Sequence, residues 1–185
     1  MWNPISPSSA QTGRPRKGVL DSQSVKSADH GGPRGYDAGK KIVGRKRHIL
    51  VDFTGVIRSL VVTTANVQDR DGAKLVLDLA KGWFPQLRAI FADSGYAGDL
   101  IRWVKGNCPG ILQTVLRPVA STGFVLLPKR WIFEQMFGWF SKYQRLTKDY
   151  ENQIGRSETM IRAAMIHRMA RRFEKIQSFA DWLSP

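Results

Sequence analysis

The sequence predicts an α/β protein in which helices flank a mixed β-sheet. Two observations favour this class. Residues 48–65 alternate in the manner of a β-hairpin, and the segments after them, over about 71–119, alternate between helical and strand-like patterns. A hairpin followed by βα units builds a sheet that holds both antiparallel and parallel strands. The chain has 185 residues, which is enough for one domain with its own core.

The first elements are predicted to be strands. Residues 18–26 begin apolar and end polar, as a short strand does, whereas the five glycines within 29–45 predict a loop. The hairpin strands are expected at 48–52 and 56–65, joined by a turn around Gly55. The second of them is rich in β-branched residues, which favour a pleated surface.

Helices and strands are expected to alternate after the hairpin. Asp69 or Asp71 would cap a helix that ends near residue 83, with Leu75, Val76 and Leu79 on its buried face. The remaining predicted elements are, in order, a strand at 87–94, a short helix at 99–106, a strand at 111–119, a long helix at about 129–147 and a last helix at about 158–176.

This order divides the chain into three regions. Residues 1–17 are rich in Pro, Ser and Gly and predict a flexible basic lead-in, residues 18–152 form the α/β domain, and residues 153–185 form a helical tail packed on it. Ser157 is expected to cap the last helix. The predicted packing stripe of that helix is Met165, Met169, Phe173 and Ile176.

The charge of the chain points to a polyanionic partner. Lys and Arg number 29 against 15 Asp and Glu, which gives a formal charge of +14. Such an imbalance is typical of proteins that bind nucleic acid or an acidic membrane surface. The sequence shows neither an apolar run of membrane-spanning length nor a signal-peptide core, and the single Cys108 excludes an internal disulfide. We therefore expect a cytoplasmic protein that contacts nucleic acid.

Three carboxylates fall at informative places in this basic chain. Asp21 is expected to end the first strand, Asp93 ends the strand after the first helix, and Glu134 lies in the first turns of the long helix. Neighbouring strand ends lie side by side, and a helix crossing the sheet can add a third side chain. Gathered carboxylates repel one another unless divalent cations neutralise them, and hard oxygen ligands suit Mg²⁺ or Mn²⁺. Two such ions can promote displacement at a phosphodiester.

Each of these carboxylates has an ordinary structural alternative. Asp21 and Asp93 each precede a serine and could be turn residues. Glu134 could simply pair with Arg130 one helical turn earlier. Asp52 is instead placed at the hairpin turn, outside the candidate site.

Basic side chains that could contact DNA form two groups. Clustered cations beside flexible glycines suit contact with a phosphate backbone, and the alternative is a solvated loop. The candidates are Lys40, Lys41, Arg45, Lys46 and Arg47 in the first group, and Arg130, Lys142 and Arg145 along the long helix in the second.

Five stretches together resemble the catalytic part of a DDE transposase of the IS4/IS5 insertion-sequence type. They are DSQSVK (21–26), GYDAGKKIVGRKRHILVD (35–52), NVQDRDGA (66–73), FADSGYAG (91–98) and RWIFEQMFGWFSKYQRLTKDYE (130–151). The resemblance covers about residues 18–175. It implies an RNase H-like fold and metal-dependent DNA cleavage and strand transfer, with Mg²⁺ as cofactor and Mn²⁺ as a possible substitute.

The resemblance also implies roles for individual residues. By motif, Asp21 and Asp93 correspond to the two catalytic aspartates and Glu134 to the catalytic glutamate, and all three would hold the metal. Arg130 fits the basic signature that precedes the glutamate. Ser141 stands where many members carry a lysine, and Lys142 follows it directly.

The resemblance finally implies partners. The DNA would comprise insertion-sequence ends and a target, bound by a homo-oligomer in a bacterial nucleoid. Only 20 residues precede Asp21, as in the second reading frame of a two-frame element, so an upstream-frame DNA-binding region is an expected partner. The alternatives are an RNase H-like nuclease without strand transfer and a non-catalytic DNA-binding fragment.

Overall fold

The computed structural model describes residues 16–29, 32–115 and 131–183. The strands are β1 (Lys17–Lys26), β2 (Gly35–Asp37), β3 (Ile42–Asp52), β4 (Ile57–Thr64), β5 (Ala89–Asp93) and β6 (Ile111–Val115). The helices are α1 (Asp69–Trp83), the 3₁₀ turn η2 (Ser94–Tyr96), α2 (Asp99–Asn107), α3 (Trp131–Ser141), α4 (Gln144–Thr147) and α5 (Ile154–Leu183).

The strands form one mixed sheet, as predicted. Its order is β2-β3-β1-β5-β6, and β4 pairs with β3. The strands β1, β2 and β4 run antiparallel to β3, whereas β1, β5 and β6 run parallel to one another. The predicted hairpin is therefore present, and the later βα units supply the parallel half of the sheet.

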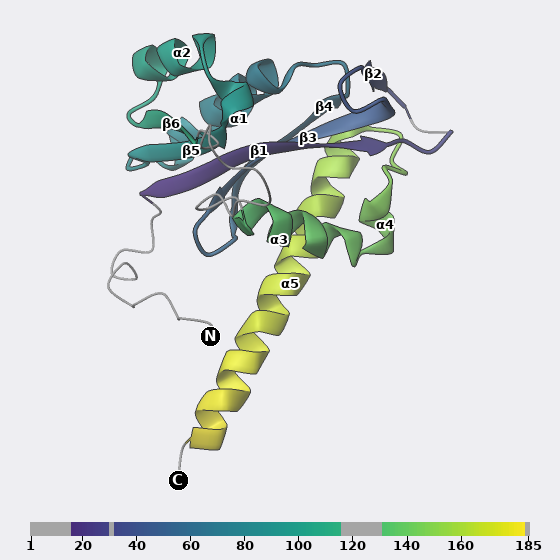
Figure 1. Ribbon diagram of the computed structural model, residues 1–185. Coiled ribbons are helices and arrows are strands. Elements are labelled where there is room, and N and C mark those ends of the chain that lie inside the picture. The colour runs from purple at the N-terminus through teal and green to yellow at the C-terminus, as the bar shows by residue number, and fades with distance from the viewer. Residues whose placement is uncertain (1–15, 30–31, 116–130, 184–185) are drawn as a thin grey trace, which may run out of the picture.

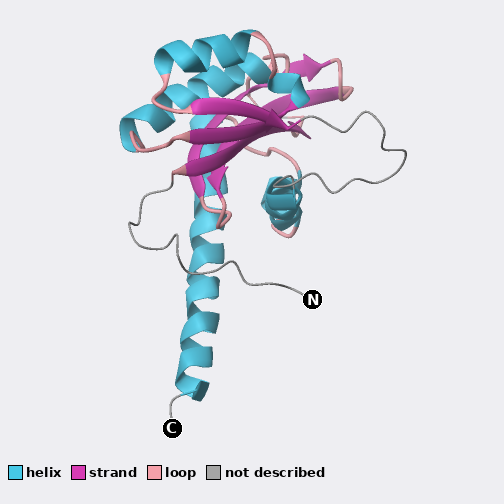
Figure 2. Ribbon diagram, turned by 60° about the vertical axis from the view of Figure 1, so that its left-hand side comes forward, coloured by secondary structure: helices cyan, strands magenta, loops and turns pink. Residues whose placement is uncertain are grey.

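Helices cover both faces of the sheet (Figures 1 and 2), and each face has its own apolar core. Strand alternation assigns side chains to the two cores: Val19 of β1 joins the core under α3 and α5, and Leu20 joins the core under α1 and α2. The core under α3 and α5 includes Val19, Ile49, Val51, Phe91, Ile132, Met136, Phe140, Ile161 and Met165. The core under α1 and α2 includes Leu20, Leu50, Val76, Leu77, Ile90, Leu100 and Val104.

Helix α1 packs closely on the sheet through a glycine. A Cβ at Gly72 would lie 2.1 Å from the ring of His48 in β3, so no larger residue fits there without movement. This contact turns Val76 into the core, but Leu75 and Leu79 remain about half exposed. The prediction that all three share a buried face was therefore wrong for both leucines.

Asp52 organises the hairpin turn, as predicted. Its Oδ1 accepts hydrogen bonds from the backbone N–H groups of Thr54 (2.8 Å) and Val56 (3.1 Å). Its Oδ2 accepts from Arg58 Nε at 2.8 Å. Gly55 supplies the positive φ of 79° that the turn needs.

Several predicted boundaries were wrong. The glycine-rich segment 29–45 is not all loop, because β2 and the start of β3 lie within it. The long helix predicted at 129–147 is two helices, α3 and α4. Between them the hydrogen bonds span three residues instead of four: the N–H of Lys142 donates to the Trp139 carbonyl (3.1 Å) and that of Tyr143 to the Phe140 carbonyl (3.0 Å).

The predicted helix caps also differ from those observed. Gln68 occupies the N-cap position of α1, so Asp69 and Asp71 lie inside its first turn, where carboxylates interact favourably with the helix dipole. Helix α5 begins at Ile154, upstream of Ser157. Ser157 is buried, and its hydroxyl donates to Asp149 Oδ1 at 2.9 Å.

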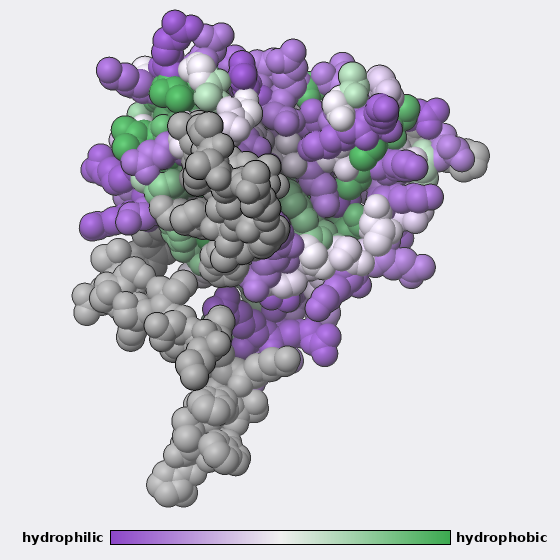
Figure 3. Space-filling view, in the orientation of Figure 1, coloured by the Kyte–Doolittle hydropathy of each residue, from purple (hydrophilic) through white to green (hydrophobic). Residues whose placement is uncertain are grey.

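Helix α5 starts on the sheet and then projects away from it (Figures 1 and 2). Ile161 and Met165 are buried in the core, whereas Phe173 is 68% exposed. The predicted packing stripe is therefore correct at Met165 and wrong at Phe173. Hydrophilic residues outnumber apolar ones among the described residues on the face shown in Figure 3. Among the residues that the structure describes, no helix has the length and apolar character needed to cross a membrane.

Candidate active site

Asp21 and Asp93 lie just beyond the point where the pairing of the parallel strands β1 and β5 ends. Asp93 ends β5, as predicted, whereas the prediction that Asp21 ends its strand was wrong, because β1 continues to Lys26 through its pairing with β3. The pairing of the two strands ends at Val19 opposite Phe91, and each aspartate comes two residues later. Side chains two residues apart in a strand point to the same face, so both aspartates lie on the face that carries Val19 and Phe91. The fold thus brings together two of the three predicted carboxylates, level with each other and on the side of α3.

The two carboxylates influence each other electrostatically. Burial raises the pKa of Asp21 to about 7, opposed by a hydrogen bond from the Ser22 N–H to Oδ1 (2.7 Å) and reinforced by the charge of Asp93. Asp93 is exposed and its Oδ1 accepts from the N–H of Gly95 at 2.9 Å, which caps η2. Asp93 therefore makes the turn contact that was its structural alternative, and its charge still acts on Asp21.

Glu134 lies exposed in the first turn of α3. The core-facing residues of this helix are Ile132, Met136 and Phe140, spaced four apart. Glu134 is two positions from Ile132, about 200° around the helix, and so lies on the opposite side. Within the described ranges, no three His, Cys, Asp or Glu side chains are placed to hold a metal ion together. The structure does not gather Glu134 with the aspartate pair.

The donor set of the pair suits a hard divalent cation. The raised pKa of Asp21 reflects the unfavourable placement of a partly buried negative charge beside Asp93, and a bound cation would offset it. Lys40 lowers that pKa, but its ammonium donates to the Ser22 carbonyl (3.4 Å). Carboxylate oxygens are the ligands that Mg²⁺ and Mn²⁺ prefer.

A family model of the transposase DDE domain matches residues 12–169. The chain belongs to this family. The match spans β1 to the middle of α5 and includes Asp21, Asp93 and Glu134. The mixed sheet with helices on both faces agrees with the RNase H-like fold of DDE transposases. No match is found among the curated proteins.

Two residues near Asp21 in this transposase domain had no predicted site role. The negative charge of Asp69 helps to raise the pKa of Asp21, and Tyr96 is buried next to the same carboxyl. Burial, followed by the charge of Asp21, raises the pKa of the Tyr96 phenol. Tyr96 follows Asp93 by three residues, and the turn at η2 places it in the core under α1 and α2. Only the folded turn shows that placement.

Three of the predicted DNA contacts are buried in this transposase domain. Arg45, Lys46 and Arg47 are 0%, 5% and 1% exposed, because they belong to the central strand β3 and not to a loop. Arg45 pairs with Asp149 at 3.0 Å. Cations buried within the protein do not contact a phosphate backbone. The prediction that these three residues belong to a DNA-binding surface cluster was therefore wrong.

Lys46 and Arg47 have internal partners of different kinds. Lys46 Nζ lies 3.1 Å from Asp37 and 2.9 Å from Asp69. Desolvation raises the pKa of Asp37, but hydrogen bonds from Ser24, the Lys40 backbone and Lys46 lower it to about 2. Arg47 donates to Gln23 Oε1 (3.1 Å) and lies 5.7 Å from the centre of the Phe140 ring. Burial lowers the pKa of Arg47 to about 10.

The other basic candidates are on the surface or outside the described residues. Lys40, Lys41, Lys142 and Arg145 are exposed, and Arg145 pairs with Glu151 at 2.9 Å. Arg130 lies outside the residues that the structure describes.

Asp21→Asn is expected to stabilise the protein at neutral and alkaline pH. The folded pKa of about 7 lies above the ordinary 3.8, so the folded state binds the proton more tightly and wild-type stability falls as pH rises from about 4 to 7. One pKa unit corresponds to about 1.4 kcal/mol, and the partial exposure of Asp21 reduces the total, so we expect a gain of about 2 kcal/mol. Urea denaturation of both proteins at pH 4 and pH 8 tests this. An equal stability difference at both pH values would contradict it.

Proposed function

We propose that this protein is an insertion-sequence transposase that cleaves DNA at the ends of its element and joins the freed 3′-OH to target DNA. The observation that carries the proposal is the Asp21–Asp93 pair, each two residues beyond the end of the β1–β5 pairing, in a chain of the DDE transposase family. The IS4/IS5 type is part of the proposal and rests on the sequence motifs.

The metal centre would be held by Asp21, Asp93 and Glu134. Bound Mg²⁺, or Mn²⁺ in its place, would supply charge neutralisation and oxygen activation for phosphodiester displacement. The Ser22 N–H holds the Asp21 carboxylate, and the Gly95 N–H holds that of Asp93, so both ligands are oriented beforehand. Glu134 lies on the side of α3 away from the core and is proposed as the third ligand from its place in the sequence motif.

The DNA would approach along the exposed cations on this side of the sheet. Lys40 lies close enough to Asp21 to lower its pKa, and Lys41 follows it in the turn before β3. Lys142 and Arg145 follow α3 and are exposed. Arg130 remains part of the proposed path through its place in the sequence. Arg45, Lys46 and Arg47 are left out because they are buried.

The joint change Lys40→Ala and Lys41→Ala is expected to weaken DNA binding and to reduce its dependence on salt. Each neutralised phosphate contributes about −0.9 to the slope of log K against log salt, so losing two contacts should reduce the slope by nearly 2. Fluorescence anisotropy with a labelled duplex at several salt concentrations measures this. The matched control is Lys74→Ala and Lys81→Ala, two lysines of α1 paired with Asp71 and Asp78. An unchanged slope in the Lys40 and Lys41 variant would remove the turn from the DNA path.

The proposed reaction is tested with labelled element ends and a target plasmid. The assay includes any upstream-frame DNA-binding region, which we propose as a partner in a homo-oligomeric complex on DNA. Mg²⁺-dependent cleavage followed by joining supports a transposase. Cleavage without joining would indicate an RNase H-like nuclease, and binding without cleavage a DNA-binding fragment.

A further inference from the structure

The turn between β2 and β3, residues 38–41, is anchored to the strand that carries Asp21. The anchor is Asp37, the last residue of β2, which is buried. Its Oδ2 accepts a hydrogen bond from Ser24 Oγ of β1 at 2.6 Å and lies 3.1 Å from Lys46 Nζ of β3. Since Ser24 is three residues from Asp21 in the same strand, these contacts hold the turn beside the candidate site.

Within this turn, the backbone around Lys40 is restricted on both sides. Asp37 Oδ1 accepts a hydrogen bond from the backbone N–H of Lys40 at 3.1 Å. The next residue, Lys41, has a φ of 54°, in the left-handed region that residues other than glycine seldom adopt. Such a conformation persists only where the surrounding structure supports it. The fold therefore defines the place of Lys40, although the residue is exposed.

The side chain of Lys40 reaches from the turn to β1. Its Nζ donates to the carbonyl oxygen of Ser22 at 3.4 Å, and Ser22 directly follows Asp21. Burial raises the pKa of Asp21, and the positive charge of Lys40 opposes that rise. Burial also acts to raise the pKa of Asp69, but hydrogen bonds, first from Lys46, and the charge of Lys40 lower it. The ammonium group therefore lies within electrostatic reach of both carboxylates.

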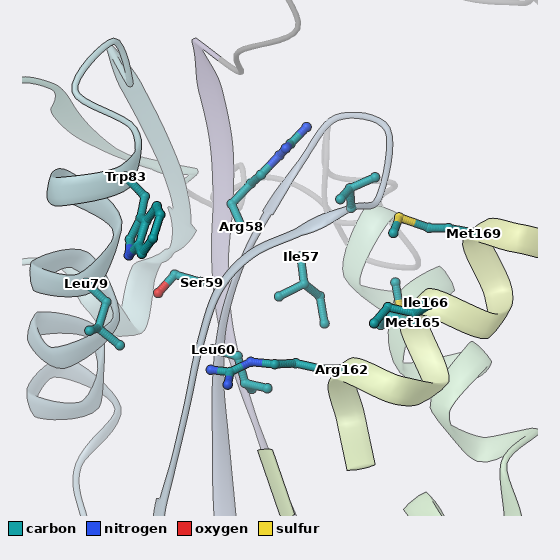
Figure 4. A pocket seen from close by; sticks show the side chains of 11 residues that line it. Ile57, Arg58, Ser59, Leu60, Leu79, Trp83, Arg162, Met165, Ile166 and Met169 are labelled. Atoms are coloured by element: carbon teal, nitrogen blue, oxygen red, sulfur yellow. The ribbon is translucent and has the colours of Figure 1, made fainter. Parts of the chain in front are cut away.

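The ammonium group of Lys40 differs from other cations on the sheet because it has no carboxylate partner within the described ranges. A groove of about 330 Å³ between α1, β4 and α5 shows the contrast (Figure 4). Arg58 and Arg162 line this groove from β4 and α5. The first already pairs with Asp52 and the second with Glu158, at 3.5 Å. A cation without an internal partner keeps its charge available for an external anion.

We propose that Lys40 is a catalytic residue, whose ammonium group contacts a non-bridging oxygen of the phosphate that is cleaved at the element end. This inference rests on the proposed function and separates Lys40 from its neighbour Lys41. Within the part of the chain that the structure describes, the Lys41 side chain makes no hydrogen bond or ion pair, and only Lys40 reaches β1. A lysine ammonium is a compact charge with three hydrogen-bond donors, which suits a phosphate oxygen.

Lys40 acts by charge and hydrogen bonding alone. In the cleavage step, a water oxygen bonds to phosphorus as the bond between phosphorus and the 3′ oxygen breaks. A proton of the water passes to solvent and the 3′ oxygen takes a proton from solvent, so Lys40 keeps its own proton throughout. A fixed cation beside the reacting phosphate stabilises the charge of the transition state and lowers the barrier.

Cleavage of labelled element-end DNA by an excess of protein in Mg²⁺ tests this role. Lys40→Ala is expected to lower the cleavage rate at saturating protein by about 100-fold, as loss of one transition-state donor does in other enzymes. Lys40→Arg should recover most of the loss, since it keeps the positive charge. Lys41→Ala should instead raise the protein concentration that gives the half-maximal rate. Equal losses of the saturated rate in the Lys40→Ala and Lys41→Ala proteins would overturn the inference.

The control for these variants is Lys74→Ala, which removes an exposed lysine of α1 that pairs with Asp71. Its saturated rate and its half-maximal concentration should equal those of the wild type. Circular dichroism of each variant should match the wild type, because the replaced side chains are exposed.

Binding to modified DNA tests the contact itself, without any reaction. A methylphosphonate at the junction of element and flanking DNA removes the charge of that one phosphate. In Ca²⁺, this change is expected to weaken binding of the wild type by about tenfold more than binding of the Lys40→Ala protein, which has already lost the charged hydrogen bond. The Lys41→Ala protein should respond as the wild type does. An equal effect in the Lys40→Ala protein and the wild type would overturn the inference.

The two experiments separate the role of Lys40 from the proposed reaction. A wild-type protein that binds element-end DNA without cleaving it would count against the proposed reaction, and the methylphosphonate comparison would still decide the place of Lys40. If the wild type cleaves and joins DNA and the Lys40→Ala protein does so at the same saturated rate, the role of Lys40 is refuted and the proposed reaction stands.

Discussion

Asp21→Asn, Asp93→Asn and Glu134→Gln are each expected to lower the rate of DNA strand cleavage by at least about 100-fold. Each change keeps the shape of the side chain and removes one negative metal ligand. DNA binding should be retained or strengthened, because a negative charge that faces phosphate is lost. Gel assays of cleavage and of binding, run on the same preparations, separate the two effects. Ca²⁺ should support binding but little cleavage, since its coordination is looser than that of Mg²⁺.

The matched control is Asp78→Asn, which removes an exposed carboxylate of α1 that pairs with Lys81. Its cleavage rate should equal that of the wild type. If the Asp93→Asn protein cleaves and joins DNA at the wild-type rate, the assignment of the metal ligands is wrong.

Arg45→Met is expected to destabilise the fold by about 3–5 kcal/mol. The guanidinium of Arg45 is fully buried and donates to Asp149 (3.0 Å), to Ser157 and to the carbonyls of Pro33 (3.0 Å) and Asn152 (3.2 Å). Methionine fills similar space but leaves the buried Asp149 without its cation. Urea denaturation followed by circular dichroism measures the loss.

The control for this change is Arg102→Met, which breaks an ion pair with Asp99 on the surface of α2. The unfolding midpoint of that variant should stay where it is, because exposed pairs are screened by water. If Arg45 acted by contacting DNA, Arg45→Met would lower DNA affinity and leave stability unchanged. That outcome would contradict the internal role found for this arginine.

The alternation of apolar residues was sufficient to predict much of the sheet. The first strand, the hairpin and the buried strand before Asp93 follow from local pattern and turn residues. The start of β3 could not be found in this way, because Arg45, Lys46 and Arg47 look like a solvated segment. Burial of these cations depends on ion pairs with residues distant in sequence, such as Asp149 for Arg45 and Asp69 for Lys46.

The candidate site, like the sheet, was predictable only in part. Asp93 follows from a strand end and both aspartates follow from the sequence motifs, whereas Asp21 lies within β1; the fold places the two at one level. The orientation of α3 depends on which of its apolar residues pack into the core. Ile132, Met136 and Phe140 do so, and Glu134 therefore lies on the outer side of the helix. Phe173 of α5 was predicted to pack in the core but is exposed, because periodicity shows that residues share a face and does not show what covers that face.

Binding of Mn²⁺ to the protein with DNA, followed by electron paramagnetic resonance of the free ion, tests most directly whether Asp21, Asp93 and Glu134 act together. The account predicts that Asp93→Asn and Glu134→Gln each weaken Mn²⁺ binding by at least about tenfold, since loss of even an indirect partner of a ligand costs about 10- to 100-fold. Asp78→Asn should bind as the wild type does. Unchanged Mn²⁺ affinity in the Glu134→Gln protein would contradict the three-carboxylate centre.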